Sequence, residues 1–383
     1  MAENSLKPTE PQPTDETINL DSSGKPEDPK LWEVHKHWYS FTRRKKIASL
    51  FLLLVIAAVA AFFLWGGHQA GAPGADNSSV KVSDKVPSPL TGEMVAPALA
   101  KRTVTGVMIE NAPEARPQSG IQDAGVVFEA IAEGGITRFL TLYQEAQPQY
   151  VGPVRSLRPY YIDWANGFDA PIAHVGGSPT ALNRIRNGGK DLDQFFNGAS
   201  YWRITSRASP HNVYTNFKNL DALNKAKGYT KSNFTGFPRK AAAPLTTPTA
   251  SVINMGISGP LFNVRYAYNA KHNYYLRSEG GAKHYAQKTT NPKSLVQLHP
   301  NVVIALITQY GLRADQHHSE YETIGHGTAY IFQDGGFTKG TWNKTARGNQ
   351  IRFNSAKGKA ITLDPGQTWI TALGAKSDLS FHK

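Results

Sequence analysis

An uninterrupted apolar segment near the N-terminus constrains this chain more than any other feature. Residues 47–65 read IASLFLLLVIAAVAAFFLW and contain no charged side chain. As a helix they would extend about 28 Å, close to the thickness of the hydrocarbon core of a bilayer. The basic run Arg43–Lys46 precedes the segment and no comparable run follows it, which predicts a cytoplasmic N-terminus. We therefore expect a single-pass protein of the cell membrane, with its C-terminal part outside the cytoplasm.

Two other structures could in principle contain such an apolar segment. A buried core helix is disfavoured, because a basic cluster and a Gly-rich stretch flank the apolar residues. A cleaved signal peptide is disfavoured by the 46 residues that precede the segment and by its length, which exceeds the usual range of about 7–15 residues. Small residues at Ala70 and Ala72 would still permit processing, so cleavage stays open.

The positive charge of the chain lies entirely after the apolar segment. The chain of 383 residues has a formal net charge of +13, and residues 1–46 contain eight Lys or Arg and eight Asp or Glu, which cancel. A basic exterior suits an anionic polymer or surface, and the predicted topology argues against nucleic acid as a partner. The absence of cysteine excludes disulfides and a lipidated cysteine.

Composition divides the chain into six parts. Residues 1–46 form a polar tail that we expect to be disordered before its basic end, 47–65 the transmembrane helix, and 66–86 a flexible linker. A stretch rich in Ala, Pro and Thr at 239–250 separates an N-terminal domain (87–238) from a C-terminal domain (251–383). The predicted fold class is α+β, with a mixed α/β first domain followed by a β-rich second domain.

Local patterns place individual elements within these two domains. In the first domain, alternation predicts strands at 103–109 and 137–143, and helices are expected at 159–165, 179–186 and 221–227. In the second domain, strands are expected at 264–268, 274–277, 302–309, 328–332 and 369–373. The pair Asp334-Gly335 predicts a hairpin turn.

Two glutamates are the candidate catalytic residues. Glu129 and Glu133 are four positions apart, so they share one face of either a helix or a strand. On a helix they would be close enough for acid–base work on a glycan, whereas on a strand they would be about 13 Å apart. The alternation Val127, Glu129, Ile131, Glu133 favours a strand. The competing interpretation pairs each glutamate with a nearby arginine.

An arginine-dense stretch is the candidate binding site. Arginine recognises carboxylate or phosphate through paired hydrogen bonds, and structural ion pairs are the equally weighted alternative. The candidate ligand-binding residues of this stretch are Arg116, Arg138, Arg155, Ser156, Arg158, Tyr160 and Asp163.

Polar turns supply the other candidates. His174 precedes Gly176-Gly177, and Ser178 is expected to cap a helix whose N-terminus could hold an anion, although an ordinary strand–turn–helix connection explains the pattern too. His211 and Asn212 form a second polar turn that could join the same cleft. No metal-ligand spacing, phosphate-binding loop or dinucleotide-binding glycine pattern occurs, so we predict neither a metal nor a cofactor.

Several longer motifs resemble one known family. PLTG (89–92), ARPQSG (115–120), AEGGITRF (132–139), GPVRSLRPYYID (152–163), HVGGSP (174–179), SPHNVYTN (209–216), YYLRSEGGAKH (274–284) and LDPGQTWI (363–370) resemble the YerB-like family of bacterial lipoproteins. The resemblance implies a two-part extracytoplasmic domain and adds His284 to the candidate ligand-binding residues. It implies no activity. Two departures stand out: the lipidated cysteine is absent, and Ala286 occupies a position where relatives usually carry an acid.

Three functions are compatible with these observations. The preferred one is a non-enzymatic envelope protein that binds an anionic wall or surface polymer, or a wall-associated partner, through an arginine-rich cleft. The alternative is a peptidoglycan-modifying hydrolase or lyase that uses Glu129 or Glu133 as acid/base. The third is a scaffold whose cytoplasmic tail recruits other proteins.

Overall fold

The computed structural model of the protein describes residues 85–383. The predicted tail, the predicted membrane anchor and most of the predicted linker lie outside the described residues. Within residues 85–383, no helix is both long and apolar enough to cross a membrane.

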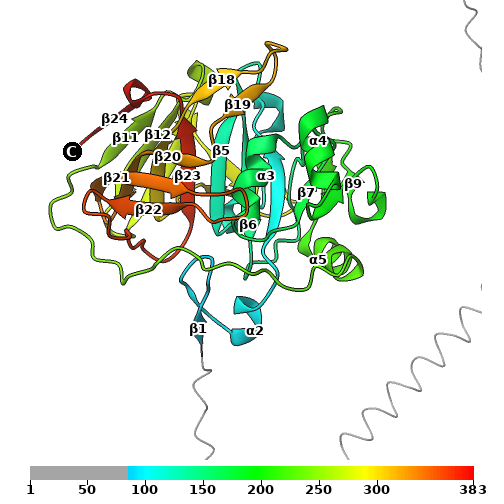
Figure 1. Ribbon diagram of the computed structural model, residues 1–383, viewed down its shortest axis with the longest axis horizontal. Helices are drawn as coiled ribbons and strands as arrows, with labels where there is room; N and C mark the ends of the chain where they lie inside the picture. The colour runs from blue at the N-terminus through cyan, green and yellow to red at the C-terminus, as the bar shows by residue number, and fades with distance from the viewer. Residues whose placement is uncertain (1–84) are drawn as a thin grey trace, which may run out of the picture. The chain divides into compact units, whose positions relative to one another are not determined.

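A ten-stranded mixed sheet forms the centre of the described chain (Figure 1). Its parallel pair β23–β5 aligns Thr368 with Val126 and Thr371 with Glu129. This pairing joins the two predicted domains in one sheet, an arrangement that no sequence pattern indicated. Across the sheet, the strands follow in the order β22 (Arg352–Ser355), β21 (Gly336–Lys344), β20 (Gly325–Gln333), β17 (Val302–Ile307), β23 (Thr368–Leu373), β5 (Val126–Glu133), β6 (Ile136–Tyr143), β3 (Thr105–Glu110), β7 (Ile172–His174) and β8 (Asp191–Asp193).

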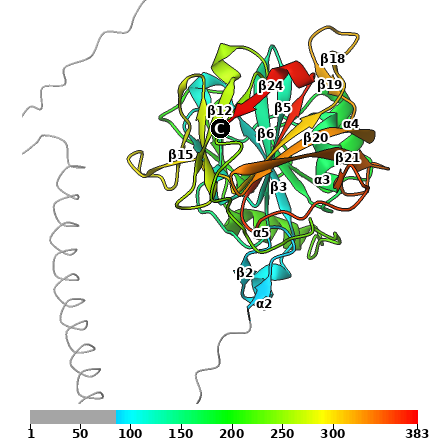
Figure 2. The ribbon, with the colours of Figure 1, turned by 90° about the vertical axis from the view of Figure 1, so that its left-hand side faces the viewer.

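Smaller sheets complete the β structure (Figure 2). One has five strands, in the order β14 (Ala282–Lys283), β13 (Tyr274–Glu279), β12 (Val264–Asn269), β11 (Val252–Met255) and β24 (Leu379–His382). Another has three, β16 (Leu295–Gln297), β15 (Tyr285–Gln287) and β4 (Gln118–Ser119), and it too joins the two halves of the chain. The two-stranded ribbons are β1 (Val86–Pro87) with β2 (Met94–Val95), β9 (Trp202–Arg203) with β10 (Val213–Tyr214), and β18 (Tyr310–Leu312) with β19 (Ser319–Tyr321).

All α-helices of the described residues lie within the predicted N-terminal domain, residues 87–238: α2 (Pro97–Ala100), α3 (Pro159–Asn166), α4 (Pro179–Arg186) and α5 (Phe217–Ala226). Local chemistry sets two of their starts. Ser178 accepts a hydrogen bond from Ala181 N at the start of α4, and Asn216 caps α5 in the same way. Short 3₁₀ turns occupy Pro113–Ala115, Ile121–Asp123, Gly198–Ser200, Pro260–Phe262 and Lys376–Asp378.

The observed elements agree with the main lines of the sequence analysis. The described residues are mainly β with few helices, and the α-helices fall between residues 87 and 238, where the sequence predicted helices. Helix α4 has the predicted bounds 179–186, and each expected strand overlaps an observed one. Asp334 and Gly335 adopt φ of 57° and 75° and join β20 to β21, which confirms the predicted hairpin. The proposed boundary at 239–250 stays a prediction.

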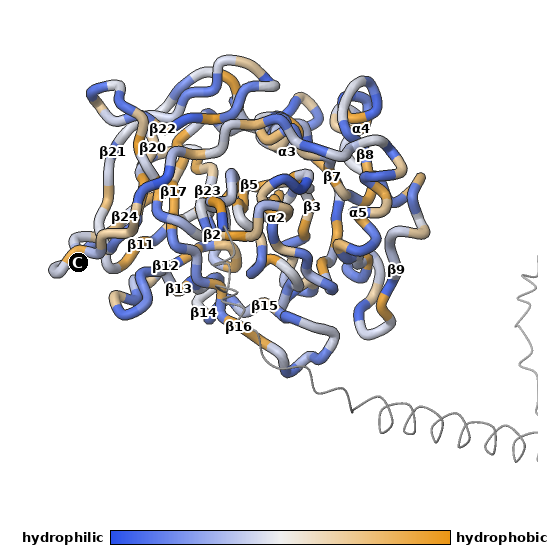
Figure 3. Tube along the Cα trace, turned by 90° about the horizontal axis from the view of Figure 1, so that it is seen from below, coloured by the Kyte–Doolittle hydropathy of each residue, from blue (hydrophilic) through white to orange (hydrophobic). Residues whose placement is uncertain are grey.

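The core lies on both faces of the large sheet. Strands β3, β17 and β23 are almost entirely buried, and in Figure 3 hydrophobic colour runs along β17 and its neighbours. On one face, α3 packs its aromatic residues against β5 and β6; Phe128 and Trp164 stack with ring centroids 5.1 Å apart. On the other face, Arg277 of β13 approaches the ring of Trp369 in β23 to 4.4 Å. A charged side chain therefore lies between the two larger sheets.

Candidate functional site

A fully buried ion pair connects the two halves of the chain. Arg277 Nη2 donates to Glu129 Oε1 at 2.8 Å, and neither side chain has any exposed surface. Trp369 Nε1 donates to the other carboxylate oxygen at 2.9 Å. Glu129 is therefore held by hydrogen bonds on both oxygens, as a buried charge requires.

The hydrogen bonds of this network fix the protonation of His284. Gln118 Nε2 donates to Glu110 O and to Asn111 Oδ1, so Gln118 Oε1 faces His284 and accepts from its Nε2 at 2.8 Å. The other ring nitrogen, Nδ1, then accepts from Arg277 Nε at 2.9 Å. Burial lowers the pKa of His284 well below its usual value, and the nearby arginine cations lower it further. His284 is thus a neutral imidazole.

Glu279 contributes the one carboxylate oxygen of this network that lacks a hydrogen bond. Its Oε1 accepts from Asn111 Nδ2 at 2.6 Å. Its Oε2 is buried without a hydrogen-bond partner, 3.3 Å from His284 Nδ1 and 3.6 Å from Arg116 Nη2. Burial raises the pKa of Glu279 to about 7, against the lowering influence of Arg277.

The connected side chains of Glu129, Arg277, His284, Gln118 and Glu279 are here called the Glu279 network. This network borders a surface hollow of about 300 Å³. Glu279 and His284 lie at its base, and Arg116 contributes a cation. The other lining residues are Pro117, Ala282, Lys283, Tyr285 and Leu295.

Glu133 lies at the end of β5 in a different cluster. Arg138 and Arg158 both donate to its carboxylate, Arg138 reaching both oxygens and Arg158 reaching Oε2. Burial would raise the pKa of Glu133, but the two arginines outweigh it and lower the pKa. Tyr160 packs beside this cluster, and its hydroxyl donates to Ile131 O at 2.6 Å.

This geometry bears on the predicted catalytic pair. Glu129 and Glu133 lie on strand β5, as the alternation predicted, and each is paired with arginine. A general acid needs a raised pKa and contact with substrate. Glu129 has no accessible surface, and the pKa of Glu133 is shifted in the opposite direction. Glu279, which the sequence analysis missed, has a raised pKa and borders a hollow open to solvent.

A sequence signal for Glu279 was nevertheless present. In β13, Tyr275, Arg277 and Glu279 alternate on the buried face. Charged residues in such positions have to be paired within the core, and they therefore mark a specific polar network.

Three arginines surround a separate hollow of about 470 Å³, here called the arginine hollow. Arg155 uses its Nε for Glu110, Arg186 one Nη for Asp193, and Arg203 one Nη for Asn212. Each guanidinium carries five N–H donors, so most of these donors remain available. The lining, described in full, contains no carboxylate; it is Arg155, Ser156, Val175, Gly176, Gly177, Leu182, Arg186, Phe195, Arg203, Pro210 and Val213.

The other predicted residues have local roles. His174 is fully buried between Gly176 O and Asp191, and Ser178 caps α4. Asp163 pairs with Arg184 and accepts from Thr323.

His211 completes the surroundings of the arginine hollow. Its Nδ1 lies 3.0 Å from Glu110 Oε2, the carboxylate that Arg155 also contacts. Asn212 accepts from Arg203. The predicted residues thus do not share one cleft. They divide among the Glu279 network, the Glu133 cluster and the arginine hollow, while His174, Ser178 and Asp163 hold separate local positions. Within residues 85–383, no group of three or more metal-ligating side chains is present.

Comparison with known proteins agrees with the motifs. Family models for the N-terminal and C-terminal domains of a protein of unknown function (DUF3048) match residues 90–230 and 255–370. The Bacillus subtilis (strain 168) protein named "Putative lipoprotein YerB" is 32% identical over 293 residues, which cover 75% of this chain and 86% of that protein. The chain belongs to the YerB-like family. The resemblance seen in the sequence is therefore confirmed.

A solved structure of the YerB-like family supports the fold. The crystal structure of YerB from Bacillus subtilis matches with a TM-score of 0.68 at 29% sequence identity. The match covers 78% of this chain and all of the YerB chain. Arg116, Arg155, Arg158, His174 and His284 all lie within the residues that the two family models match.

Proposed function

We propose that this YerB-like protein is an extracytoplasmic envelope protein that binds an anionic wall or surface polymer at the arginine hollow. The observation that carries the proposal is the lining itself, in which all charged side chains are arginines. Polymers with repeated phosphate or carboxylate groups would present anions at regular spacing. Guanidinium groups bind such anions through paired, charge-assisted hydrogen bonds.

Two further features support this proposal. The exposed ring of Phe195 borders the hollow and could contact the uncharged parts of a polymer repeat. The net charge of +13 would attract a polyanion from a distance, with a strength that falls as salt is added.

The envelope location rests on the sequence and on the relative. The name of the Bacillus subtilis relative describes a lipoprotein, a class anchored at a membrane surface. In this chain the apolar segment 47–65 would provide the anchor, with the N-terminus in the cytoplasm. The described residues would then be held near the membrane on its outer side.

The alternative of a glycan-cleaving enzyme that uses Glu129 or Glu133 has weaker support. Both carboxylates are engaged by arginine; Glu129 has no exposed surface, and the pKa of Glu133 is lowered rather than raised. The scaffold hypothesis concerns the cytoplasmic tail, which lies outside the described residues.

Binding of the full-length protein to cell-wall sacculi tests the proposal. Sacculi with their anionic polymers attached should bind it more strongly than sacculi stripped of these polymers, and binding should weaken with salt. The triple variant R155Q/R186Q/R203Q should lose affinity about tenfold or more, because each exposed contact contributes up to about 1 kcal/mol.

The matched control is R265Q/R347Q/R352Q, which removes three exposed arginines elsewhere. It should bind nearly as well as the natural protein. Equal binding by both triple variants, or binding that salt does not weaken, would contradict the proposal. Thermal unfolding of each variant verifies that the fold is retained.

A further inference from the structure

The ribbon β18–β19 has one anchored strand and one exposed strand. Tyr321 of β19 is buried, its ring lies 5.0 Å from that of Tyr160, and its hydroxyl accepts from Ile131 N at 3.1 Å. In β18, by contrast, Tyr310 is 39% exposed and Leu312 is 48% exposed. The ribbon is therefore fixed to the core through β19 and presents β18 outward.

The hydrogen-bond pattern leaves the outer edge of β18 unoccupied. Glu322 N donates to Gln309 O, and Arg313 N donates to His318 O. Because hydrogen-bonded and non-hydrogen-bonded pairs alternate in an antiparallel ladder, Gly311 also bonds to β19. The backbone N–H and C=O groups of Tyr310 and Leu312 consequently point away from β19. Among the described residues, no other strand pairs with β18.

The side chains of this edge do not discourage an added strand. Exposed edges in natural proteins are generally kept short, or carry a lysine, a proline or a bulge. Strand β18 is short, with three residues, but Tyr310, Gly311 and Leu312 provide neither a charge nor a proline. The edge is thus suited to accept an extended segment.

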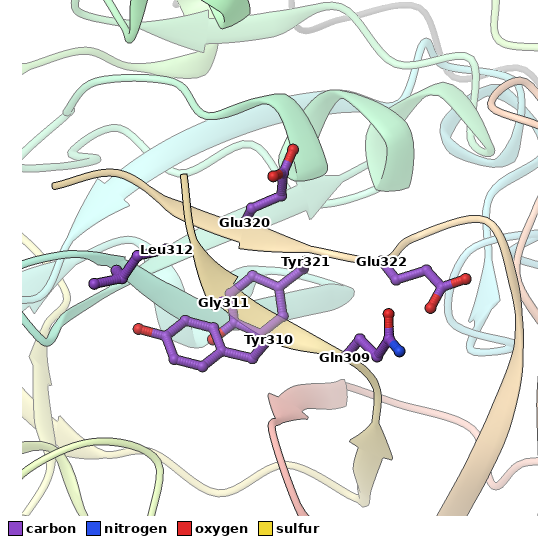
Figure 4. A pocket seen from close by; sticks show the side chains of 7 residues that line it. All are labelled: Gln309, Tyr310, Gly311, Leu312, Glu320, Tyr321 and Glu322. Atoms are coloured by element: carbon purple, nitrogen blue, oxygen red, sulfur yellow. The ribbon is translucent and has the colours of Figure 1, made fainter. Parts of the chain in front are cut away.

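A hollow of about 540 Å³ adjoins the edge (Figure 4). The β18–β19 ribbon that lines this hollow has two chemically different faces. Side-chain alternation puts Tyr310, Tyr321 and Leu312 on one face, where the two rings lie 5.0 Å apart. Glu320 and Glu322 belong to the other face. Gly311, paired with Glu320, has no side chain to obstruct access to that carboxylate.

The two carboxylates are weakly neutralised within the described chain. Glu320 has Arg313 at 3.6 Å and is 61% exposed, so this ion pair contributes little. Glu322 makes no ion pair with any residue in the range 85–383. Two such acidic groups on a protein of net charge +13 form a site of opposite sign to the molecule as a whole.

We propose that β18 binds an extended, lysine-bearing peptide segment of a partner as an added antiparallel strand. The segment would exchange backbone hydrogen bonds with Tyr310 and Leu312. Its apolar side chains would cover Tyr310 and Leu312, and its lysines would cross Gly311 toward Glu320 and Glu322. The partner segment would therefore alternate basic and apolar residues.

Direct binding of designed peptides to the full-length protein tests this inference. The probe is acetyl-Lys-Val-Lys-Val-Lys-amide, and acetyl-Glu-Val-Glu-Val-Glu-amide is its charge-reversed control. In the antiparallel arrangement the valines face Tyr310 and Leu312 and make the backbone hydrogen bonds. N-methylation of both valines should thus reduce affinity about tenfold or more, whereas N-methylation of the central lysine should have little effect.

Variants of the protein test the same two contributions. E320Q/E322Q should reduce affinity for the lysine peptide about fivefold, and the control E93Q/E114Q, at two exposed glutamates, should not. L312P should weaken binding without unfolding the protein, because an edge strand tolerates proline where its N–H faces solvent. The inference is overturned if the lysine peptide does not bind, if the acidic peptide binds equally well, or if the two methylated peptides bind alike.

Discussion

Glu133 and Glu279 are both largely buried carboxyl groups with two arginines nearby, yet their pKa values shift in opposite directions. Around Glu133, the arginines Arg138 and Arg158 lower the pKa. Around Glu279, burial raises the pKa to about 7 although Arg277 lies 3.4 Å away and Arg116 3.6 Å away. The number of neighbouring cations therefore does not determine the state of a buried acid.

Two physical differences separate the sites. The Glu133 side chain is 20% exposed and the Glu279 side chain 1%, so ionisation of Glu279 loses much more hydration. Both arginines at Glu133 donate close hydrogen bonds to it, whereas Arg277 bonds mainly to Glu129 and is shared between two carboxyl groups. The direction of each pKa shift therefore depends on how exposed the carboxyl group is and on whether its arginines also bind another carboxylate.

The largest effect should come from removing the shared cation. Arg277→Met leaves Glu129 buried without its counter-charge, and we expect a loss of about 3–5 kcal/mol in the free energy of unfolding. Urea unfolding of the full-length protein measures it. The control Arg265→Met, exposed on the neighbouring strand β12, should change stability by less than about 0.5 kcal/mol. A mild effect of Arg277→Met would show that the buried pair is not the link between the halves.

The Glu279 site should give a stability that falls as pH rises. Its folded pKa of about 7 exceeds its ordinary value of 4.5, so the folded state holds a proton that the unfolded state has released. This contribution is complete below about pH 4.5 and is lost as the pH approaches 7, by up to about 3 kcal/mol. Unfolding measured between pH 4 and 8 should show the decline. Glu279→Gln should abolish this decline in stability. If the decline persisted in that variant, a group other than Glu279 would cause it.

The Glu133 site should behave in the opposite sense. Its folded pKa lies below 4.5, so its contribution is present at neutral pH and is lost as the pH falls through the folded pKa. Glu133→Gln should cost about 1–3 kcal/mol at pH 7, because Arg138 and Arg158 would face each other without a counter-charge. In acid the variant and the natural protein should converge. If the stability difference between Glu133→Gln and the natural protein were as large in acid as at pH 7, the lowered pKa of Glu133 would not be its cause.

The smallest effect should be the influence of the Glu129 carboxylate on the pKa of Glu279. The charge of Glu129 helps to raise the pKa of Glu279, so Glu129→Gln should lower that pKa by about one unit. Carboxyl carbon NMR, with the Glu279 resonance assigned from Glu279→Gln, follows this shift. An unchanged pKa in the Glu129 variant would mean that burial alone sets it.

Much of the local structure could be predicted because its causes are local. Ser178 and Pro179 start helix α4 within one turn, and Asp334-Gly335 supplies the positive φ angles of a tight hairpin. The alternation around Glu129 gave strand β5 correctly.

The sites depended on contacts between distant segments. Arg155 was a candidate from the sequence, but Arg186 and Arg203 join it only because α4 and β9 fold beside the same hollow. Glu129 and Arg277 are 148 positions apart, and no spacing rule links them.

By itself, the sequence determined the predicted membrane topology, the helix starts, the strand alternation and the family, because each depends on neighbouring residues or on whole motifs. Only the tertiary structure decided which arginine meets which carboxylate. The parallel pairing of β23 with β5 joins the two halves, and the packing of β13 over that pair removes Glu279 from water. A pKa depends on that local dielectric environment and on nearby charges, neither of which a linear order of residues contains.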